Sequence, residues 1–447
     1  MPATSVSYKC PNCGAPLSYL PGTDHVTCEY CGTTFETDVI EDMFQKAQER
    51  AAAAEREQEE KWATETAGEG WSEEEAAGLH AFHCSACGAE LVTDANTMAT
   101  ECCYCGNPTM IPARFDGALK PDEIIPFQKT KKEAVAALKA FYEGKRLLPA
   151  AFKKGNRVEH VQAMYVPYWL FDAKIKAQAT FRAKHIHEYD DGDENVKEIS
   201  VYECYREGKM TFLRVPVDGS EKMDDTFMES IEPFDYSQLE DFTPAYLTGA
   251  LADRYDVDAD AAIPRADERI AQSAADLLED TVEDYDEVEI NGEPNIRKKK
   301  GDVAYVMAPV WILTTRYENT PYMFLMNGQT GKMAGSLPYD HAKSYVYFAI
   351  STLISWPILY FLIDFVSEDD GIRFSLLVLF VAFIAALFCG YAVRKYFIDQ
   401  MSNVHPAPDA TEYLKKGSFK LTDEDDTYLY TRTIRTKKES GGTTTSA

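Results

Sequence analysis

The segment Tyr8-Lys9-Cys10-Pro11-Asn12-Cys13-Gly14-Ala15 opens a four-cysteine pattern that occurs twice in this chain. Two thiolates two residues apart can reach one ion from a tight turn, and two such turns complete a tetrahedral all-sulfur site. The repetition therefore predicts two zinc ribbons of one design, each holding one Zn²⁺. Their ligands are Cys10, Cys13, Cys28 and Cys31 in the first copy, and Cys84, Cys87, Cys102 and Cys105 in the second.

The two copies also match outside the cysteines. The segment Phe82-His83-Cys84-Ser85-Ala86-Cys87-Gly88-Ala89 parallels the opening segment, and the second turn of each copy ends in Tyr-Cys-Gly. These matches indicate an internal duplication. Four thiolates close the coordination shell, whereas a catalytic zinc keeps one position for water. We therefore expect two structural zinc ions.

The charge around both patterns bears on the kind of partner. Residues 8–36 contain Lys9 as their only Lys or Arg, and residues 82–106 contain none. The whole chain has a net charge of −28, and residues 218–289 supply −19 of it, with 23 acidic against 4 basic residues. Ribbons that bind nucleic acid display cations to phosphates. A protein partner is therefore favoured over nucleic acid.

Two late apolar stretches predict a transmembrane hairpin. Residues 344–366 and 374–393 are each long enough to cross about 30 Å of hydrocarbon as a helix. A buried hairpin in a soluble protein is the alternative, and the lengths disfavour it. Lys343 precedes the first stretch and Arg394-Lys395 follows the second, whereas the connection 367–373 between them is mainly acidic. The positive-inside rule then places both chain ends in the cytoplasm.

The flanking segments add two expectations about the membrane assembly. The N-terminus lacks a basic region followed by an apolar stretch, so no cleavable signal peptide is expected. Ala382, Ala386 and Gly390 form a stripe of small residues at helical spacing. Such a stripe can seal one hairpin or pair two hairpins, so the sequence leaves an oligomer open.

Together these signals predict a multidomain chain with two small four-cysteine zinc ribbons, an α+β domain with an antiparallel sheet, and a two-helix transmembrane hairpin. The reducing environment of the cytoplasm suits this cysteine usage. The expected divisions are ribbon 1 in residues 1–36, a helical spacer and hinge in 37–81, ribbon 2 in 82–110, the α+β cytoplasmic domain in 111–342, the hairpin in 343–395, and a cytoplasmic tail with a disordered end in 396–447.

Periodicity places elements within these divisions. A helix is expected over about 38–62, followed by a flexible hinge over 67–76 that carries Gly68 and Gly70. Thr130 and Glu133 form a capping box that opens a helix to about Tyr142. Apolar residues alternate with polar ones over 173–184, which predicts a strand with one buried face. Further strands are expected at 199–205, 210–217, 310–317 and 322–327, and helices at 244–255 and 264–278.

A fainter repeat links the two ends of the α+β domain. Val166-Pro167-Tyr168-Trp169-Leu170-Phe171 is similar to Ala308-Pro309-Val310-Trp311-Ile312-Leu313, and both precede an expected hairpin. We interpret this similarity as a duplicated strand unit.

Other chemical signals are weaker. Cys103, Cys204 and Cys389 have no partner at ligand spacing, and His83, His185 and His187 are interpreted as solvated or hydrogen-bonded histidines. Residues 328–333 lack the spacing of a phosphate loop and are expected to form a hairpin turn. Asp256, Asp258 and Asp260 lack the later residues of a calcium loop. No catalytic constellation can be assembled, so we do not expect an enzyme.

These residues together resemble a bacterial family of TFIIB-type zinc ribbon-containing membrane proteins. The resemblance implies a bacterial cytoplasmic-membrane protein with no established catalytic activity, and some similar proteins hold soluble partners at the bilayer in membrane-stress modules. Besides the ribbons, it is carried by Tyr165-Val166-Pro167-Tyr168-Trp169-Leu170-Phe171-Asp172, Val215-Pro216-Val217-Asp218-Gly219-Ser220, Ile231-Glu232-Pro233-Phe234-Asp235-Tyr236 and Met326-Asn327-Gly328-Gln329-Thr330-Gly331-Lys332.

Two functional hypotheses remain. The first is a membrane-anchored adaptor whose cytoplasmic ribbons dock protein partners, in line with a membrane-stress role. The alternative is a nucleic-acid-binding regulator tethered to the membrane. Its support is the ribbon pattern and the cationic strand face formed by Lys174, Lys176, Arg182 and Lys184, a face that could equally meet anionic lipid or another part of the chain.

Overall fold

The computed structural model describes residues 8–17, 23–56, 60–94, 97, 101–113, 119–155, 160–318, 320–366 and 376–437. The helices are α1 Thr37–Arg56, η1 Thr64–Thr66, α2 Glu73–Ala77, α3 Lys131–Tyr142, α4 Ala150–Gly155, α5 Asp225–Ser230, η2 Tyr236–Gln238, η3 Pro244–Leu247, α6 Ala259–Glu279, α7 His341–Val366, α8 Leu376–Asp399 and η4 Thr411–Tyr413, where η marks a 3₁₀-helix. The strands are β1 Tyr8–Lys9, β2 Pro16–Leu17, β3 His25–Thr27, β4 Thr34–Glu36, β5 Leu79–Cys84, β6 Glu90–Asp94, β7 Met110–Ala113, β8 Glu123–Ile124, β9 His160–Asp191, β10 Glu194–Asp218, β11 Glu240–Asp241, β12 Leu251–Asp253, β13 Glu287–Ile290, β14 Asn295–Tyr317, β15 Thr320–Asn327, β16 Met333–Gly335 and β17 Lys420–Lys437.

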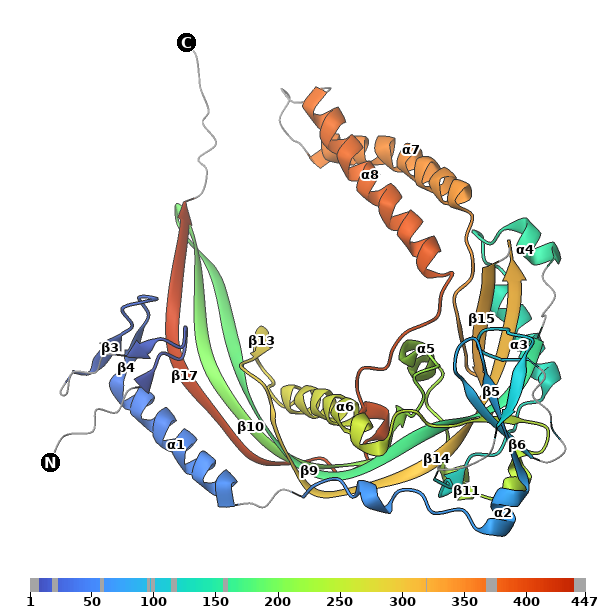
Figure 1. Cartoon of the computed structure of the whole chain (residues 1–447). Helices are drawn as coiled ribbons and strands as arrows, with labels where there is room; N and C mark the ends of the chain where they lie inside the picture. The colour runs from blue at the N-terminus through green and yellow to red at the C-terminus, as the bar shows by residue number, and fades with distance from the viewer. Residues whose placement is uncertain are drawn as a thin grey trace.

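One large sheet organises the molecule (Figure 1). It has 13 strands, with the order β11-β8-β14-β9-β12-β6-β5-β7 and side branches through β10, β13, β15, β16 and β17. The pairings of β12 with β9 and of β8 with β14 are parallel, and the others are antiparallel. The expected antiparallel sheet is therefore a mixed one. The strands of ribbon 2, β5, β6 and β7, belong to this sheet.

The strands β9, β10 and β17 form a long antiparallel arm that extends away from the rest of the sheet (Figure 1). The predicted alternation over 173–184 is confirmed, because its apolar members are buried while Lys174 is exposed. Burying one face at every second residue is what a strand allows and a helix does not. The buried members are Ala173, Ile175, Ala177, Ala179, Phe181 and Ala183.

The two strands expected at 199–205 and 210–217 are one strand, β10. Its pairing with β9 shifts register between Phe212 and Val215, and Arg214 there has a φ of 60°. The Arg214 amide donates to the Asp172 carboxylate at 2.6 Å instead of joining the ladder. Such a bulge bends a strand without ending it. Residues 206–209, which separate the two expected strands, pair with β9 without interruption.

The helix predictions succeed where local capping decides. The helix expected after Thr130 is α3, with the capping box in place. Helix α6 begins five residues before the expected start, because Asp258 accepts a hydrogen bond from the Ala261 amide and caps it. The helix expected at 244–255 is wrong: this segment is η3 followed by β12, which is drawn into the sheet between β9 and β6.

The expected hinge at 67–76 is also wrong, because this segment packs on the sheet. Just before it, the buried Trp62 ring lies 4.9 Å from Phe171 and its indole N–H donates to Asp267 at 3.0 Å. Trp71 lies edge-on to Phe242 at 5.8 Å, and Ser72 opens α2 with a capping box. Trp62 and Trp71 thus hold on the sheet a segment that was expected to be flexible because it contains Gly68 and Gly70.

The duplicated strand unit is supported by pairing between its own two copies. β9 and β14 are antiparallel neighbours in which Val166 lies opposite Ala308, the equivalent residue of the other copy. The carbonyl of each following proline accepts an amide hydrogen bond from a glycine, at 2.9 Å from Gly219 to Pro167 and 2.7 Å from Gly328 to Pro309. The two halves are therefore related by a local twofold axis through this pairing.

Each half also carries an equivalent helix. The indole of Trp169 donates to the Val257 carbonyl at 2.9 Å, and the indole of Trp311 donates to the Lys129 carbonyl at the same distance. Val257 and Lys129 each precede the N-cap residue of a helix, α6 in one half and α3 in the other. The duplicated unit is thus a short strand, a helix and a hairpin, and each short strand pairs in parallel with the other half's long strand.

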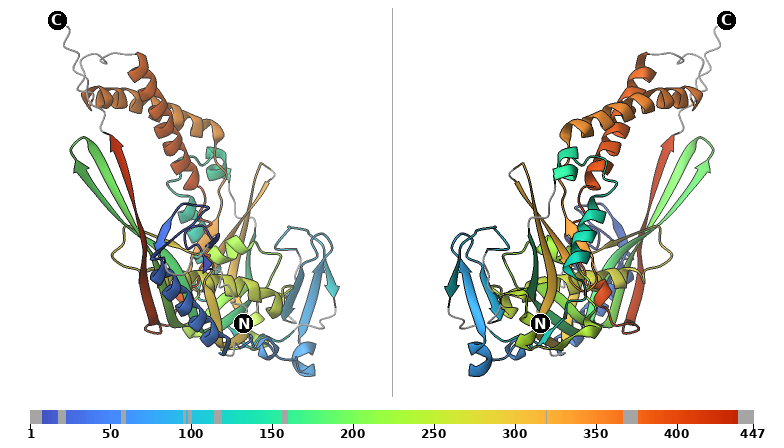
Figure 2. Two further views of the ribbon diagram at one scale, coloured as in Figure 1. Left: turned by 90° about the vertical axis from the view of Figure 1, so that its left-hand side faces the viewer. Right: turned by 90° about the vertical axis from the view of Figure 1, so that its right-hand side faces the viewer.

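Helices α7 and α8 are both long and apolar enough to cross a membrane. The small-residue stripe of Ala382, Ala386 and Gly390 is buried between them, and a Cβ added at Gly390 would lie 2.1 Å from the Thr352 hydroxyl. The stripe therefore seals this hairpin within one chain. Figure 2 shows the hairpin and the strand arm projecting to the same side of the molecule.

The segment after the hairpin is more ordered than the expected tail. Met401 accepts a hydrogen bond from the Leu337 amide at 2.8 Å, which holds the end of α8 beside the start of α7. The chain then returns along the sheet and forms β17 at the outer edge of the arm. The predicted acidic connection at 367–373 and the predicted disordered end at 441–447 lie outside the described residues.

Candidate metal centres

Both ribbons build their cysteine turns in the same way. In ribbon 1 the Cys10 amide donates to Ala15 at 2.7 Å, and the Gly14 amide donates to Cys10 at 2.8 Å. The corresponding bonds in ribbon 2 run from Cys84 to Ala89 and from Gly88 to Cys84, both at 2.9 Å. Gly14 and Gly88 have φ near +75°, which favours glycine and aims both thiols of the turn to one side.

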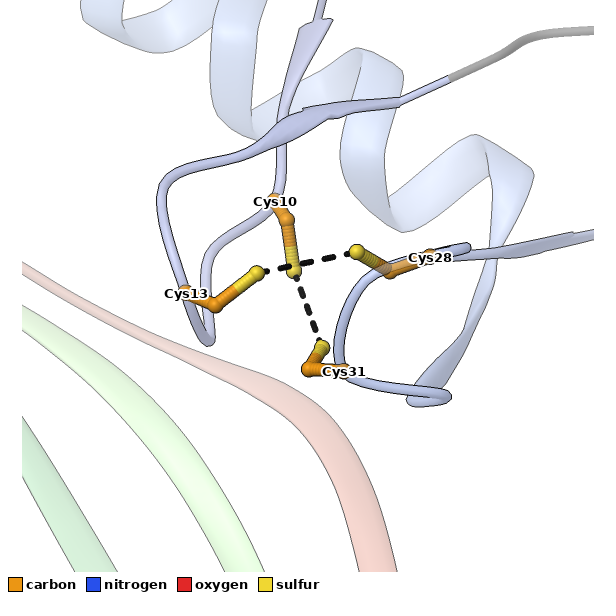
Figure 3. Close-up of side chains that lie close together, drawn as sticks. All are labelled: Cys10, Cys13, Cys28 and Cys31. Atoms are coloured by element: carbon orange, nitrogen blue, oxygen red, sulfur yellow. Dashed lines mark hydrogen bonds between the residues drawn. The ribbon is translucent and has the colours of Figure 1, made fainter.

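The eight predicted ligands form two compact groups of four sulfurs. In ribbon 1 the Sγ atoms of Cys10 and Cys31 lie 3.7 Å apart, and those of Cys13 and Cys28 lie 3.6 Å apart (Figure 3). In ribbon 2 the pairs Cys84–Cys105 and Cys87–Cys102 are both 3.6 Å apart. A tetrahedron with Zn–S bonds of about 2.3 Å requires S···S separations of about 3.8 Å. Both groups therefore fit a tetrahedral metal ion such as zinc, and all four positions are taken by sulfur.

The thiols of ribbon 1 start from different acidities. Burial raises the pKa of Cys10 to about 12, whereas a 3.3 Å hydrogen bond with the Thr33 hydroxyl lowers the pKa of Cys31 to about 6. A cysteine must lose its proton to bind a metal, so metal uptake releases protons.

Ribbon 1 is seated on the strand arm. Phe35 and Ile40 pack against Val201 of β10 and Leu429 of β17. The Arg182 guanidinium donates to the carbonyls of Pro11 and Asn12, within the first cysteine turn. A cation is thereby held beside the sulfur cluster.

Helix α1 extends this seat along β17. Lys46 pairs with Asp425 at 3.1 Å, and Arg50 pairs with Asp423 at 3.4 Å. The Arg50 guanidinium also lies over the Tyr205 ring, 3.6 Å from its centroid. The first part of α1, up to Arg50, is in this way tied to the arm, whereas Ala51, Ala52, Ala53 and Arg56 beyond it are exposed.

Ribbon 2 is joined to the sheet by strands and by its second turn. β12 pairs with β6, and the Tyr104 hydroxyl donates to the buried Asp253 carboxylate of β12 at 2.5 Å. Ser220 donates to the same oxygen at 2.6 Å, and the Met164 sulfur lies 3.3 Å from the Tyr104 hydroxyl. Burial raises the pKa of Asp253 to about 7.

The remaining sequence candidates lie elsewhere. Cys103, Cys204 and Cys389 are outside both sulfur groups, and His185 stacks on Tyr285 at 4.6 Å. Residues 328–331 form the expected turn, closed by a 2.9 Å bond from the Gly331 amide to Asn327. Sequence reasoning missed the Tyr104–Asp253 contact, although an aspartate directly after the apolar residues Ala250-Leu251-Ala252 was a usable signal.

The cationic strand face is largely engaged within the molecule. Lys176 pairs with Glu207 at 2.9 Å and Lys184 pairs with Glu287 at 2.8 Å, while Arg182 binds ribbon 1. Of the alternatives weighed for this face, contact with another part of the chain accounts for these three residues.

The fold and the sites define a protein with two four-cysteine centres built around a mixed sheet that carries a helical hairpin suited to crossing a membrane. No family model matches the chain, and no solved structure matches it. The chain belongs to the same family as the uncharacterized protein YdjG of Bacillus subtilis (strain 168), to which it is 33% identical over 344 residues, covering 77% of this chain and 93% of that protein.

Proposed function

We propose that this protein is a membrane-anchored adaptor of the TFIIB-type zinc ribbon-containing membrane protein class. In this proposal α7 and α8 cross the cytoplasmic membrane with both chain ends in the cytoplasm, and zinc-loaded ribbon 1 docks a protein partner. The observation that carries the proposal is the contrast between closed four-sulfur sites, which leave no position for a substrate, and a ribbon surface that stays exposed.

The acidic surface supports a protein partner. Each Zn(Cys)₄ group would carry a net charge of about −2, and ribbon 1 contributes only Lys9 as a fixed cation. The nucleic-acid alternative loses support, because three of the four cations on its strand face already bind groups of the same chain. Phosphate binding requires cations that are free to meet the backbone.

Affinity capture from detergent extracts tests the proposal. Wild type, Cys10→Ser and Cys84→Ser would be tagged at the same position and compared by quantitative mass spectrometry. We expect Cys10→Ser to lose partners that the wild type retains. Identical partner sets for all three proteins would refute docking through the ribbons.

The same preparations test the alternative. A soluble fragment is not needed, because the full-length protein can be titrated with labelled DNA and RNA at low salt. We expect no binding, and salt-dependent binding with a steep slope would favour the tethered regulator.

A further inference from the structure

The duplication lets one ribbon serve as a model for what the other binds. Tyr104 of ribbon 2 lies between the ligands Cys102 and Cys105, and Tyr30 lies at the same place between Cys28 and Cys31 of ribbon 1. Tyr104 is partly buried and its hydroxyl is bonded to Asp253, whereas 74% of the Tyr30 side chain is exposed. The two turns have similar backbone conformations, but only the tyrosine of ribbon 2 is bonded to another segment.

The backbone match makes this comparison a close one. The Cys28 amide donates to Thr33 at 2.9 Å and the Gly32 amide donates to Cys28 at 2.9 Å. In ribbon 2 the Cys102 and Gly106 amides make the same two bonds at the same distances. Gly32 and Gly106 have φ of 73° and 71°. Each turn therefore presents its tyrosine from the same scaffold.

Ribbon 2 shows the chemistry that this turn recognises. Its partner is an extended strand, β12, which carries an acidic residue after two small or apolar ones, in the order Leu251-Ala252-Asp253. The strand adds to the ribbon's own strand β6, and its carboxylate accepts the tyrosine hydroxyl at 2.5 Å in a setting that Met164 keeps apolar. A hydrogen bond to a charged acceptor is about twice as strong as a neutral one.

We propose that the Tyr30 turn of ribbon 1 is a second, outward-facing copy of this docking surface, which binds an extended partner segment with an Asp or Glu following apolar residues. This inference rests on the adaptor function proposed above and specifies its site and its partner chemistry. Glu29 is exposed and occupies the place of Cys103. A basic residue beside the partner's acid, as Arg254 stands beside Asp253, would meet that charge.

The strand arm leaves this surface accessible. Ribbon 1 contacts the arm through Phe35, Ile40 and the first cysteine turn, with Arg182 bound at Pro11 and Asn12. Tyr30 belongs to the second turn, whose Cys28 is part of this apolar cluster, but the Tyr30 side chain itself is outside the cluster and exposed. A partner can therefore reach Tyr30 without displacing ribbon 1 from its seat.

The chain itself supplies the probe. A labelled peptide with the sequence of residues 248–257 (Thr-Gly-Ala-Leu-Ala-Asp-Arg-Tyr-Asp-Val) would be titrated into the zinc-loaded full-length protein in detergent. We expect saturable binding that weakens about tenfold in Tyr30→Phe and about tenfold for the peptide with Asp253→Asn, since a charged hydrogen bond is lost in each case. Tyr189→Phe, which removes a hydroxyl that donates to Glu198 near the β9–β10 turn of the arm, should bind like the wild type.

Because Tyr30 is exposed, Tyr30→Phe should keep its fold, and equal zinc content would confirm this. Absence of saturable binding, or equal binding by wild type and Tyr30→Phe, would overturn the inference. The capture experiment fails separately: if Cys10→Ser loses partners while the peptide does not bind, ribbon docking stands and this assignment of its site falls. If the peptide binds through Tyr30 while capture shows no difference, the peptide-binding site on ribbon 1 stands and the docking of cellular partners through the ribbons falls.

Discussion

The eight cysteines act as two sets of four, and each set depends on every member. Removing one thiolate from a closed shell leaves three ligands and an open position, which suits a catalytic zinc site and not a structural one. We expect the wild type to bind two zinc ions per chain and Cys13→Ser to bind one. Elemental analysis of purified protein measures this directly, with Cys389→Ser as a control that should retain two. Two ions in Cys13→Ser would contradict the assigned ligand set.

Asp253 predicts a pH dependence of stability. Burial raises its pKa from 3.8 to about 7, so ionising it costs more in the folded than in the unfolded protein. Its contribution to stability is complete below pH 4 and is lost as pH rises through about 7. We expect Asp253→Asn to lack this loss, so its denaturation midpoint should rise relative to that of the wild type as the pH increases from 5 to 8.

Taking the difference between the two proteins removes the pH dependence of zinc binding, which both share. A difference in midpoint that stays constant from pH 5 to pH 8 would show that the Asp253 carboxyl titrates normally. The hydrogen bonds from Tyr104 and Ser220 favour the charged form and limit the size of the effect.

Among the elements, ribbon 1 and the helix α1 that follows it are held on the arm in part by one side chain, Arg182. Arg182 bonds two carbonyls of the first cysteine turn, and a hydrogen bond from a charged group contributes about 1.5–3 kcal/mol. We expect Arg182→Ala to loosen ribbon 1 from the arm and to speed amide exchange in α1 roughly tenfold. Hydrogen exchange measured by mass spectrometry reports this, and Lys174→Ala on the exposed side of the same strand is the matched control. Unchanged exchange in α1 would assign the seat to the apolar contacts and to the ion pairs of Lys46 and Arg50.

The elements also show which parts of the fold were predictable. The cysteine turns, the capping box at Thr130 and the alternation over 173–184 are local patterns, and each was confirmed. The segments 67–76 and 244–255 were assigned wrongly, because Trp62 and Trp71 bind the first to the sheet and β9 pairs with the second. Contacts between residues far apart in sequence decided both, and local propensity gives way to them.

The candidate sites divide in the same way. Ligand spacing lies within about twenty residues and can be read from the sequence, whereas Arg182 reaches ribbon 1 across 171 positions and Tyr104 reaches Asp253 across 149. No local pattern connects such residues. The difference between an occupied ribbon 2 and an exposed ribbon 1 was therefore visible only in three dimensions.

At the scale of the whole molecule, the two ribbons have unequal structural roles. The strands of ribbon 2 belong to the main sheet, but ribbon 1 has its own two-stranded sheets and sits on the arm. We expect Cys84→Ser to lower the unfolding midpoint of the sheet and Cys10→Ser to leave it nearly unchanged. Intrinsic fluorescence reports on the buried Trp169 and Trp311 in this region. Equal losses in both variants would show that ribbon 1 also supports the sheet.

The central claim is that zinc in ribbon 1 enables an anchored protein to hold a partner. The most direct measurement takes a partner identified by capture, binds it to the immobilised full-length protein, and follows its release while zinc is removed by a chelator and then restored. We predict that the partner leaves the wild type on chelation and rebinds when zinc returns, and that Cys10→Ser never holds it. A partner retained equally with and without zinc would contradict the account.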